Sequence, residues 1–320
     1  MQETFNTPKS ASSANQEPIK PELAQLVTEF NKRGFVILRA AFDPSQVSLL
    51  QNKILSRAPN DLKWRIKYAG GEISIREASN VYTSIPEAKA LFAHSPVLSV
   101  IRAILGEPIY LYRDAYVEKA PNPHATFPLH QDSEFWDIRP SRLVSLWVPA
   151  QDSNSTNGVL EVVPGSHLAH QPHVIKVGST IALPDFINNI LRKFANKVTG
   201  EKNSEKKTGL LRFLIVRLGN FINGTVFPFL SRNFKPFEKF TELFVIKNDA
   251  DYWKQTELHD LKIGDCVVYH SETIHGSKGN FTGNSRGAYI PSFMGESFMR
   301  NGVAVSDPSL GYVRIDGWET

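Results

Sequence analysis

Two residues near the middle of the chain, His130 and Asp132, have side chains that bind divalent metal ions. In an extended strand, residues two positions apart point to the same face, so this imidazole and this carboxylate are expected to meet at one point. Two histidines and one carboxylate that leave the remaining coordination positions open are typical of non-haem Fe(II) oxygenases. A His-x-Asp pair is common by chance, and the prediction of a metal site therefore depends on finding a third ligand.

The third predicted ligand is His275, which is followed by Gly and Ser and comes shortly after an apolar strand expected at 266–270. His270, at the end of that strand, is the alternative. Arg286 begins another expected strand eleven residues after His275. Its guanidinium could hold a carboxylate through two parallel hydrogen bonds, which a lysine cannot reproduce.

The elements that must position these residues change in character along the chain. Amphipathic stripes, Pro at a first turn and Gly at an end predict helices at 21–33, 43–56, 86–93 and 96–105. Short apolar runs predict strands at 35–38, 109–119, 127–136, 142–150, 159–163 and 266–270. We expect 159–163 to be the hairpin partner of 142–150, because the loop between them ends in Asn-Gly.

Many short strands after a helical beginning predict a mainly β fold with flanking helices, in the α+β class. The expected core is a β-sandwich or a jelly roll, the latter being a cupin-like double-stranded β-helix, with an N-terminal helical layer and a helical insertion. We expect a disordered polar tail at 1–18 and one oxygenase domain at 19–320. In a jelly roll, strands that are distant in sequence lie side by side, so His275 can join His130 and Asp132.

The insertion, at about 178–245, is expected to contain helices and is locally basic. Between Lys176 and Lys239 there are twelve Lys or Arg and four Asp or Glu, a local charge of +8 within a total of +4. The favoured interpretation is a helical pair that packs on the sheet or at a dimer contact. The alternative is peripheral contact with a membrane or another anionic surface.

Composition narrows the class of protein further. The single cysteine, Cys266, excludes an internal disulfide and a cysteine-type zinc site, and it lies in an apolar run as a core residue does. The N-terminus has no apolar segment typical of a signal peptide, and no run reaches the roughly 18 apolar residues that span a bilayer. We expect a cytoplasmic protein that does not bind nucleic acid.

Taken together, the ordered motifs resemble the phytanoyl-CoA dioxygenase family of Fe(II)/2-oxoglutarate oxygenases. The similarity extends from about residue 22 to 295 and is interrupted by the insertion. The matching residues are His130-Gln-Asp132, Trp136, Trp147, the segment from Asn157-Gly to Pro-Gly-Ser-His167, His275-Gly-Ser277 and Arg286.

The resemblance implies that His130, Asp132 and His275 hold Fe(II) and that 2-oxoglutarate chelates the metal and reacts with O2. It implies that Arg286 and Ser277 hold the far carboxylate of 2-oxoglutarate. Trp136 and Trp147 match positions that line the cosubstrate pocket, although either is also explained as a core residue. The segment ending in His167 is expected to be structural.

The function implied is hydroxylation of an unactivated C–H bond in a small-molecule metabolite or acyl substrate, with release of succinate and CO2. Related halogenases lack the carboxylate that Asp132 supplies here. Desaturation, ring formation and demethylation stay open, as do the substrate and the oligomeric state. Two rival functions use the same scaffold: a zinc hydrolase with Glu134 as general base, and a non-catalytic binding protein.

Overall fold

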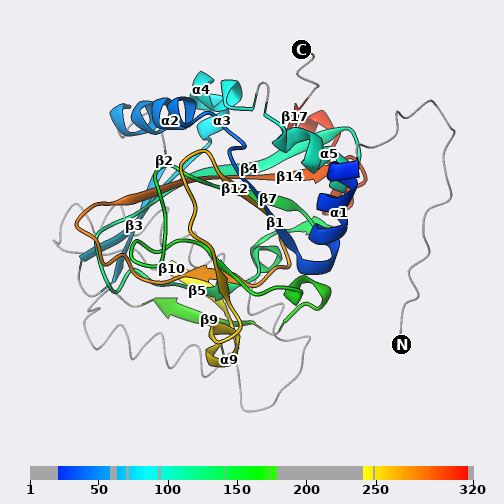
Figure 1. Ribbon diagram of the computed structural model, residues 1–320. Helices are drawn as coiled ribbons and strands as arrows, with labels where there is room; N and C mark the ends of the chain where they lie inside the picture. The colour runs from blue at the N-terminus through cyan, green and yellow to red at the C-terminus, as the bar shows by residue number, and fades with distance from the viewer. Residues whose placement is uncertain are drawn as a thin grey trace, which may run out of the picture.

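Two antiparallel β-sheets face each other in the computed structural model, with helices packed on the outside of the larger sheet (Figure 1). The structure describes residues 21–57, 63–69, 72–92, 95–140, 142–171, 173–178, 241–247 and 249–315. In spatial order, the larger sheet consists of β1 (Phe35–Leu38), β12 (Cys266–His270), β7 (Val144–Pro149), β14 (Arg286–Gly295), β4 (Ile109–Lys119), β3 (Glu72–Ser79) and β2 (Lys63–Ala69), and β17 (Val313–Ile315) pairs with β4.

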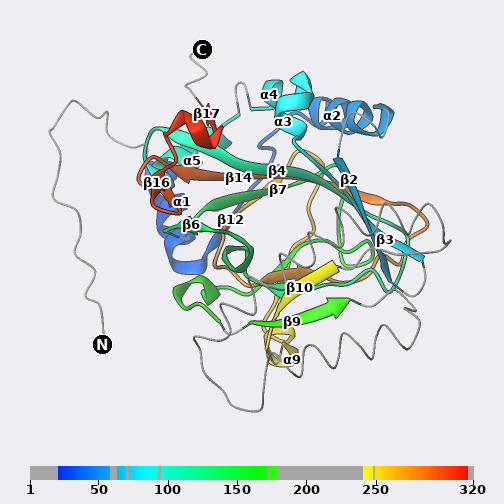
Figure 2. The same cartoon turned by 180° about the vertical axis from the view of Figure 1, so that it is seen from behind.

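The smaller sheet carries the metal-ligand candidates. Its order is β11 (Glu257–Leu258), β8 (Glu161–Val162), β13 (His275–Ser277) and β5 (Phe127–His130). A separate pair joins β9 (His173–Gly178) to β10 (Thr241–Ile246), and a small sheet joins β16 (Val303–Ala304), β15 (Met299–Arg300) and β6 (Ile138–Arg139). Viewed from behind, β9 and β10 lie below the larger sheet (Figure 2).

Helices cover the outer face of the larger sheet. They are α1 (Pro21–Arg33), α2 (Pro44–Ser56), α3 (Val81–Ser84), α4 (Pro86–Ala90) and α5 (Val97–Leu105), and α9 (Ala250–Trp253) lies near the smaller sheet (Figure 1). Short 3-10 turns are η1 (Asp132–Phe135), η2 (Ser166–Leu168) and η4 (Pro308–Leu310). Among the described residues, no helix combines the length and apolar character needed to cross a membrane.

Side chains of the larger sheet alternate between its two faces, and each face contributes to a different hydrophobic core. In β12, Cys266 and Val268 pack with the outer helices, whereas Val267 and Tyr269 face the smaller sheet. In β7, Trp147 lies on the inner side. This period of two is a direct consequence of the strand pleat. The inner face therefore presents large side chains to the space where the candidate ligands lie.

A glycine joins the first helix to the first strand. Gly34 has a φ of +81°, and its N–H donates to the carbonyl of Phe30 at 2.7 Å, which ends α1. A Cβ at Gly34 would lie 2.5 Å from both His167 Nδ1 and Thr273 Oγ1. The Thr273 hydroxyl donates to the carbonyl of Gly34 at 2.8 Å. The end of α1 therefore packs directly against the loop that precedes His275.

Most expected elements are present, and one expected strand pairing is wrong. The predicted helices and the strands at 35–38, 109–119 and 266–270 are confirmed. The hairpin of β2 and β3 was not expected. The expected pairing of 159–163 with 142–150 is wrong, because β8 pairs with β11 and β13 in the smaller sheet, while β7 belongs to the larger one. The intervening loop crosses between the sheets instead of closing a hairpin.

The predicted tail at 1–18 lies outside the described residues. So does most of the predicted insertion, since the structure describes β9 up to Gly178 and β10 from Thr241 and omits 179–240. The two strands pair with Thr241 opposite Gly178. The helical character of this segment and its membrane contact stay predictions. The mainly β architecture with an N-terminal helical layer is confirmed.

Candidate metal and cosubstrate site

Three side chains from two strand ends and one turn converge inside the molecule. His130 ends β5, His275 begins β13, and the two residues are opposite each other in the antiparallel pair, with ring centroids 4.3 Å apart. Asp132 Oδ1 lies 3.4 Å from His130 Nε2 and 3.7 Å from His275 Nε2. Among the described residues, these are the one group of such side chains whose candidate ligand atoms all lie within 4.8 Å of one another.

The route by which Asp132 reaches this point differs from the expectation. Strand β5 ends at His130, and Asp132 opens the 3-10 turn η1, so the two residues do not share a strand face. The turn is held by the N–H of Glu134, which donates to the carbonyl of Gln131 at 3.2 Å, and by the N–H of Ser133, which donates to the carbonyl of Ser271 at 3.2 Å. The turn, and not strand alternation, brings the carboxylate back toward the imidazoles.

Backbone carbonyls set the orientation of both imidazoles. His130 Nδ1 lies 2.9 Å from the carbonyl oxygen of Pro128, and His275 Nδ1 lies 2.8 Å from that of Thr273. A carbonyl only accepts, so each Nδ1 carries the proton and each Nε2 presents its lone pair. Metal-bound histidines are held in the same way, by an acceptor that binds the ring N–H on the side away from the metal. Both Nε2 atoms face Asp132.

The protonation states also suit a divalent cation. Burial lowers the pKa of His275 to about 4, with His130 as the second cause. Burial by itself would raise the pKa of Asp132, but the neighbouring imidazoles of His275 and His130 bring it down to about 2. At neutral pH both groups are therefore deprotonated, which metal binding requires. The donor set fits a metal ion with open positions.

Tyr269 supports the carboxylate from the opposite sheet. Its hydroxyl donates to Asp132 Oδ2 at 3.4 Å, and its ring lies 4.8 Å from that of His275. Burial and the nearby Asp132 raise the pKa of Tyr269, so the phenol keeps its proton. The sequence analysis did not select Tyr269. Its inward position in the strand 266–270 was the available signal.

Two buried cations lie further along the same inner space. Arg286 and Lys119 are opposite each other in the pairing of β14 with β4 and are only 3% and 1% exposed. Arg286 Nη2 donates to the carbonyl of Gly158 at 2.6 Å. Lys119 Nζ donates to Ser277 Oγ at 2.7 Å and to the carbonyls of Ser277 and Lys278 at 3.3 and 2.5 Å.

No carboxylate of the described chain pairs with either cation. Burial lowers the pKa of Arg286 to about 10, and burial together with Arg286 lowers the pKa of Lys119. Arg286 Nε is buried without a hydrogen-bond partner in the described structure. Buried like charges are costly unless an anion compensates them. The pair is therefore suited to receive a carboxylate from a bound molecule.

The cation pair is adjacent to the metal-ligand candidates. Ser277 follows His275 by two residues in β13 and accepts the hydrogen bond from Lys119. Gly158, in the Asn-Gly motif, has a φ of +74°, and a Cβ there would lie 2.6 Å from the carbonyl oxygen of Lys278 and 2.9 Å from Lys119 Cδ. The sequence analysis did not select Lys119 as a site residue, because no neighbouring residue distinguishes it from any other lysine at the end of a strand.

The two candidate tryptophans lie in different surroundings. The guanidinium carbon of Arg286 is 5.1 Å from the centre of the Trp147 ring, which places Trp147 beside the cation pair. Trp136 packs edge-on against Tyr112 at 5.1 Å in a separate apolar cluster with Ile138. A role for Trp136 in cosubstrate binding stays a prediction, since its recorded contacts are those of a core residue.

The other histidines have different partners. His270, the alternative third ligand, is half-buried near Phe30, and its Nδ1 accepts a hydrogen bond from the N–H of Glu272 at 3.0 Å. His167 Nε2 lies 3.0 Å from the carbonyl oxygen of Asn31. Glu134, the general base of the hydrolase alternative, lies 3.2 Å from His170 Nε2. A hydrolase would leave the buried pair of Lys119 and Arg286 without a purpose.

Comparison with known proteins agrees with the geometry. Residues 30–182 match the model of the family described as Phytanoyl-CoA dioxygenase (PhyH), which confirms the resemblance noted in the sequence. An ectoine dioxygenase from Sphingopyxis alaskensis is 26% identical over 161 residues, which are 48% of this chain and 51% of that relative. A phytanoyl-CoA dioxygenase from Arabidopsis thaliana is 28% identical over 98 residues, 30% of this chain and 34% of the relative. The chain thus matches about half or less of the length of these curated relatives.

Solved structures share the fold over most of the chain. The non-heme alpha ketoglutarate dependent carbocyclase SnoK has a TM-score of 0.57 and 16% identity, with 96% of this chain and 97% of that chain covered. The epimerase SnoN, solved in complex with Fe3+, alpha ketoglutarate and nogalamycin RO, has a TM-score of 0.56 and 14% identity, with 87% and 86% covered. At such identities the likeness concerns the fold, and it confirms the predicted jelly roll.

Proposed function

The chain carries the phytanoyl-CoA dioxygenase family pattern over residues 30–182, and from this premise we propose that it is an Fe(II)/2-oxoglutarate-dependent dioxygenase. The observation that carries the proposal is the combination of two neighbouring sites. The candidate ligand atoms of His130, Asp132 and His275 converge on one point, and a buried pair of cations that forms no ion pair with a carboxylate of the described residues lies beside it. A keto acid with a second carboxylate would bind to both sites at once.

Each protein group has a defined role in this proposal. His130, Asp132 and His275 hold the metal, while Tyr269 keeps the carboxylate in place. Lys119, Arg286 and Ser277 bind the far carboxylate of 2-oxoglutarate, and Trp147 forms a wall beside Arg286, whereas Trp136 packs in an apolar cluster. When Fe(II) and 2-oxoglutarate are bound, they supply oxidation of a substrate C–H bond by O2, with succinate and CO2 as coproducts.

We propose that the substrate is a small molecule and that the reaction is hydroxylation. The presence of Asp132 supports hydroxylation over halogenation. The names of the similar proteins include an ectoine dioxygenase, a carbocyclase and an epimerase. These names support a small-molecule substrate and a family scaffold that serves several oxidations. The protein positions the reactive C–H bond and excludes water, as in other cofactor enzymes.

An anaerobic titration of the metal-free protein with Fe(II) and 2-oxoglutarate tests the proposal. We expect the visible metal-to-ligand charge-transfer band of the chelate to appear. Asp132→Ala should abolish the band, because the metal loses its only carboxylate ligand. Arg286→Ala should keep metal binding but raise the 2-oxoglutarate concentration required. Tight zinc binding without the band would favour the hydrolase, and absence of any metal binding would favour a non-catalytic protein.

A further inference from the structure

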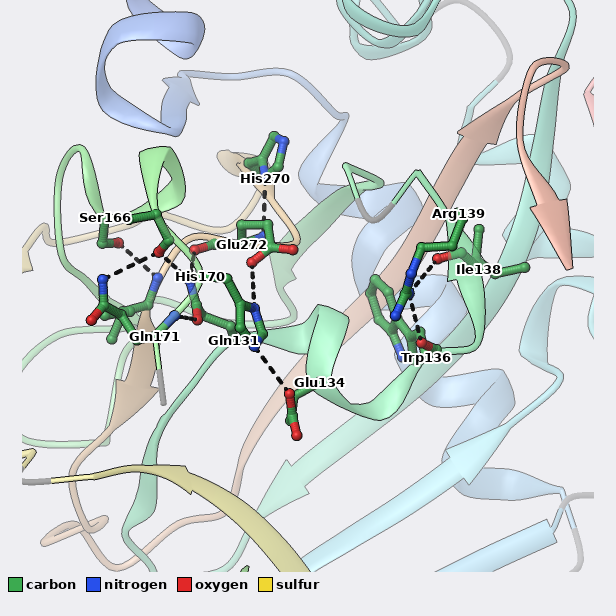
Figure 3. A network of polar contacts seen from close by, with 12 residues as sticks. Gln131, Glu134, Trp136, Ile138, Arg139, Ser166, His170, Gln171, His270 and Glu272 are labelled. Atoms are coloured by element: carbon green, nitrogen blue, oxygen red, sulfur yellow. Dashed lines mark hydrogen bonds and ion pairs between the residues drawn. The ribbon is translucent and has the colours of Figure 1, made fainter. Parts of the chain in front are cut away.

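One loop contacts both the turn that carries Asp132 and the segment that precedes His275. His170 lies between two carboxylates, with Nδ1 2.9 Å from Glu272 Oε2 and Nε2 3.2 Å from Glu134 Oε2 (Figure 3). Glu134 belongs to the turn η1 that Asp132 opens, and Glu272 precedes His275 by three residues. One imidazole therefore connects the segments of two ligands that are far apart in sequence.

The burial of these groups makes the connection significant. The side chains of Glu134 and Glu272 are only 6% and 11% exposed, whereas that of His170 is 50% exposed. Both ring nitrogens of His170 lie within hydrogen-bond distance of a carboxylate oxygen, and a carboxylate only accepts hydrogen bonds. Charge-assisted hydrogen bonds to buried carboxylates are among the stronger contacts in proteins. The imidazole ring of His170 thus sets the distance between the carboxylates of Glu134 and Glu272.

Further hydrogen bonds join the same three segments. Gln131, between two of the ligands, is fully buried, and its Nε2 donates to the carbonyl of Glu272 at 2.6 Å. Its Oε1 accepts from the N–H of Gln171 at 2.8 Å. Ser166 Oγ accepts from the N–H of Ile274, the residue before His275, at 2.8 Å. The loop 166–171, the turn η1 and the segment 271–274 form one hydrogen-bonded unit.

We propose that His170 is a positioning residue for the metal site, which it serves by fixing the turn of Asp132 relative to the segment before His275. The inference rests on the proposed metal site. Metal ligands must be held within roughly 0.5 Å of their productive positions. Loss of an outer partner typically costs about 10–100-fold in metal affinity. His170 contacts neither the metal nor the cosubstrate in this arrangement and acts through Glu134 and Glu272.

The test is a Co(II) titration of the full-length, metal-free protein, with the absorption of Co(II) as a report of its coordination. We expect His170→Ala to weaken Co(II) binding by about tenfold or more. His170→Gln keeps one donor and should fall between this variant and the unaltered protein. His259→Gln is the matched control, because His259 also lies 3.2 Å from a carboxylate, that of Glu257, outside the unit. The control should bind Co(II) normally.

Thermal unfolding of the metal-free proteins separates positioning from stability. Affinities are compared well below the unfolding midpoint of each variant, and His170→Gln carries the test if His170→Ala does not fold. The proposal would be overturned if both variants bound Co(II) with an affinity within twofold of that of the unaltered protein and gave the same absorption spectrum. This holds whatever the thermal unfolding midpoints of the variants are. An equal loss in His259→Gln would also overturn it. Absence of Co(II) binding by the unaltered protein would instead overturn the metal site itself, and the positioning role with it.

Discussion

At the scale of single residues, Lys119 and Arg286 are the groups whose burial most requires a bound partner. Both lie on adjacent strands of the larger sheet, and neither forms an ion pair with a carboxylate of the described residues, although the more distant carboxylate of Glu161 acts to raise the pKa of Lys119. The hydrogen bonds of Lys119 go to neutral oxygens of Ser277 and Lys278. Such an arrangement is unfavourable in isolation and favourable when an anion enters. The carboxylate of 2-oxoglutarate supplies that anion in the proposed function.

Lys119→Met is expected to weaken 2-oxoglutarate binding by about tenfold or more, because hydrogen bonds to charged groups contribute roughly 1.5–3 kcal/mol. Metal affinity should stay unchanged, since Lys119 contacts no ligand of the metal. Calorimetric titration of the Co(II)-loaded protein with 2-oxoglutarate measures the effect. Lys262→Met is the control, because Lys262 pairs with Asp152 at the surface with 74% of its side chain exposed. An unchanged affinity in Lys119→Met would contradict the predicted role.

His270 shows how burial changes the response to pH. Burial, with neighbouring His167 as a second cause, lowers the pKa of His270 from its ordinary 6.5 to about 4. Between these two values the unfolded chain binds a proton that the folded chain does not. The free energy of unfolding therefore falls as the pH drops from about 6.5 to about 4. The contribution of this histidine is at most roughly 3 kcal/mol.

His270→Gln should make this pH dependence shallower, since the substituted side chain does not titrate. Chemical denaturation of the metal-free protein at pH 7 and pH 4.5 gives the free energy of unfolding at each value. The difference between the two pH values should be smaller in the variant than in the unaltered protein. Equal differences would show that His270 does not titrate in this range on unfolding.

At the scale of elements, the turn η1 and the end of α1 decide how the site is built. A strand that continued past His130 would keep Asp132 in extended backbone, but the chain turns and is tied to Ser271. The helix α1 ends on Gly34, which packs against His167 and Thr273. The N-terminal helix is thereby connected to the loop that carries His275.

Gly34→Ala should destabilise the protein more than Gly311→Ala does. Both glycines have positive φ values, +81° and +69°, so both substitutions carry a backbone penalty of about 1–2 kcal/mol. Only at Gly34 would the new methyl group lie 2.5 Å from other side chains, whereas no atom lies within 4 Å of it at Gly311. Urea denaturation measures the two free energies. Equal losses of the free energy of unfolding in the two variants would mean that the residues around Gly34 move aside without an energetic cost.

At the scale of the whole molecule, a metal ion would join segments that are far apart in sequence. His130 and Asp132 belong to β5 and η1, and His275 belongs to β13. A metal that binds only the folded chain stabilises it by mass action, by about 2.7 kcal/mol at a concentration 100 times its Kd. Metal binding and global stability are therefore coupled.

Co(II) at this excess should raise the thermal midpoint of the unaltered protein by several degrees. Asp132→Ala should lose this rise, whereas Asp251→Ala, whose side chain is 80% exposed, should keep it. Protons compete with the metal for His275, whose pKa is about 4, so metal affinity should fall as the pH drops toward that value. Differential scanning fluorimetry measures the midpoints. An equal rise in Asp132→Ala would place the metal elsewhere.

The sequence by itself determined the elements whose signals are local. Helix stripes, terminal glycines and apolar runs predicted α1, α2, α5, β4 and β12, and the order of motifs predicted the family resemblance. The ligands His130, Asp132 and His275 were selected by residue type and by their place in that order. These features depend on neighbours a few residues away, and such neighbours are visible in a sequence.

Only the tertiary structure decided which distant residues meet. Lys119 faces Arg286 because β4 and β14 pair, and Tyr269 reaches Asp132 because the two sheets face each other. The hairpin predicted for 159–163 was wrong because β8 gains partners in the opposite sheet. His170 joins Glu134 to Glu272 through a contact between segments about a hundred residues apart in sequence. Sheet pairing and packing across the core set these contacts, and neither follows from local propensity.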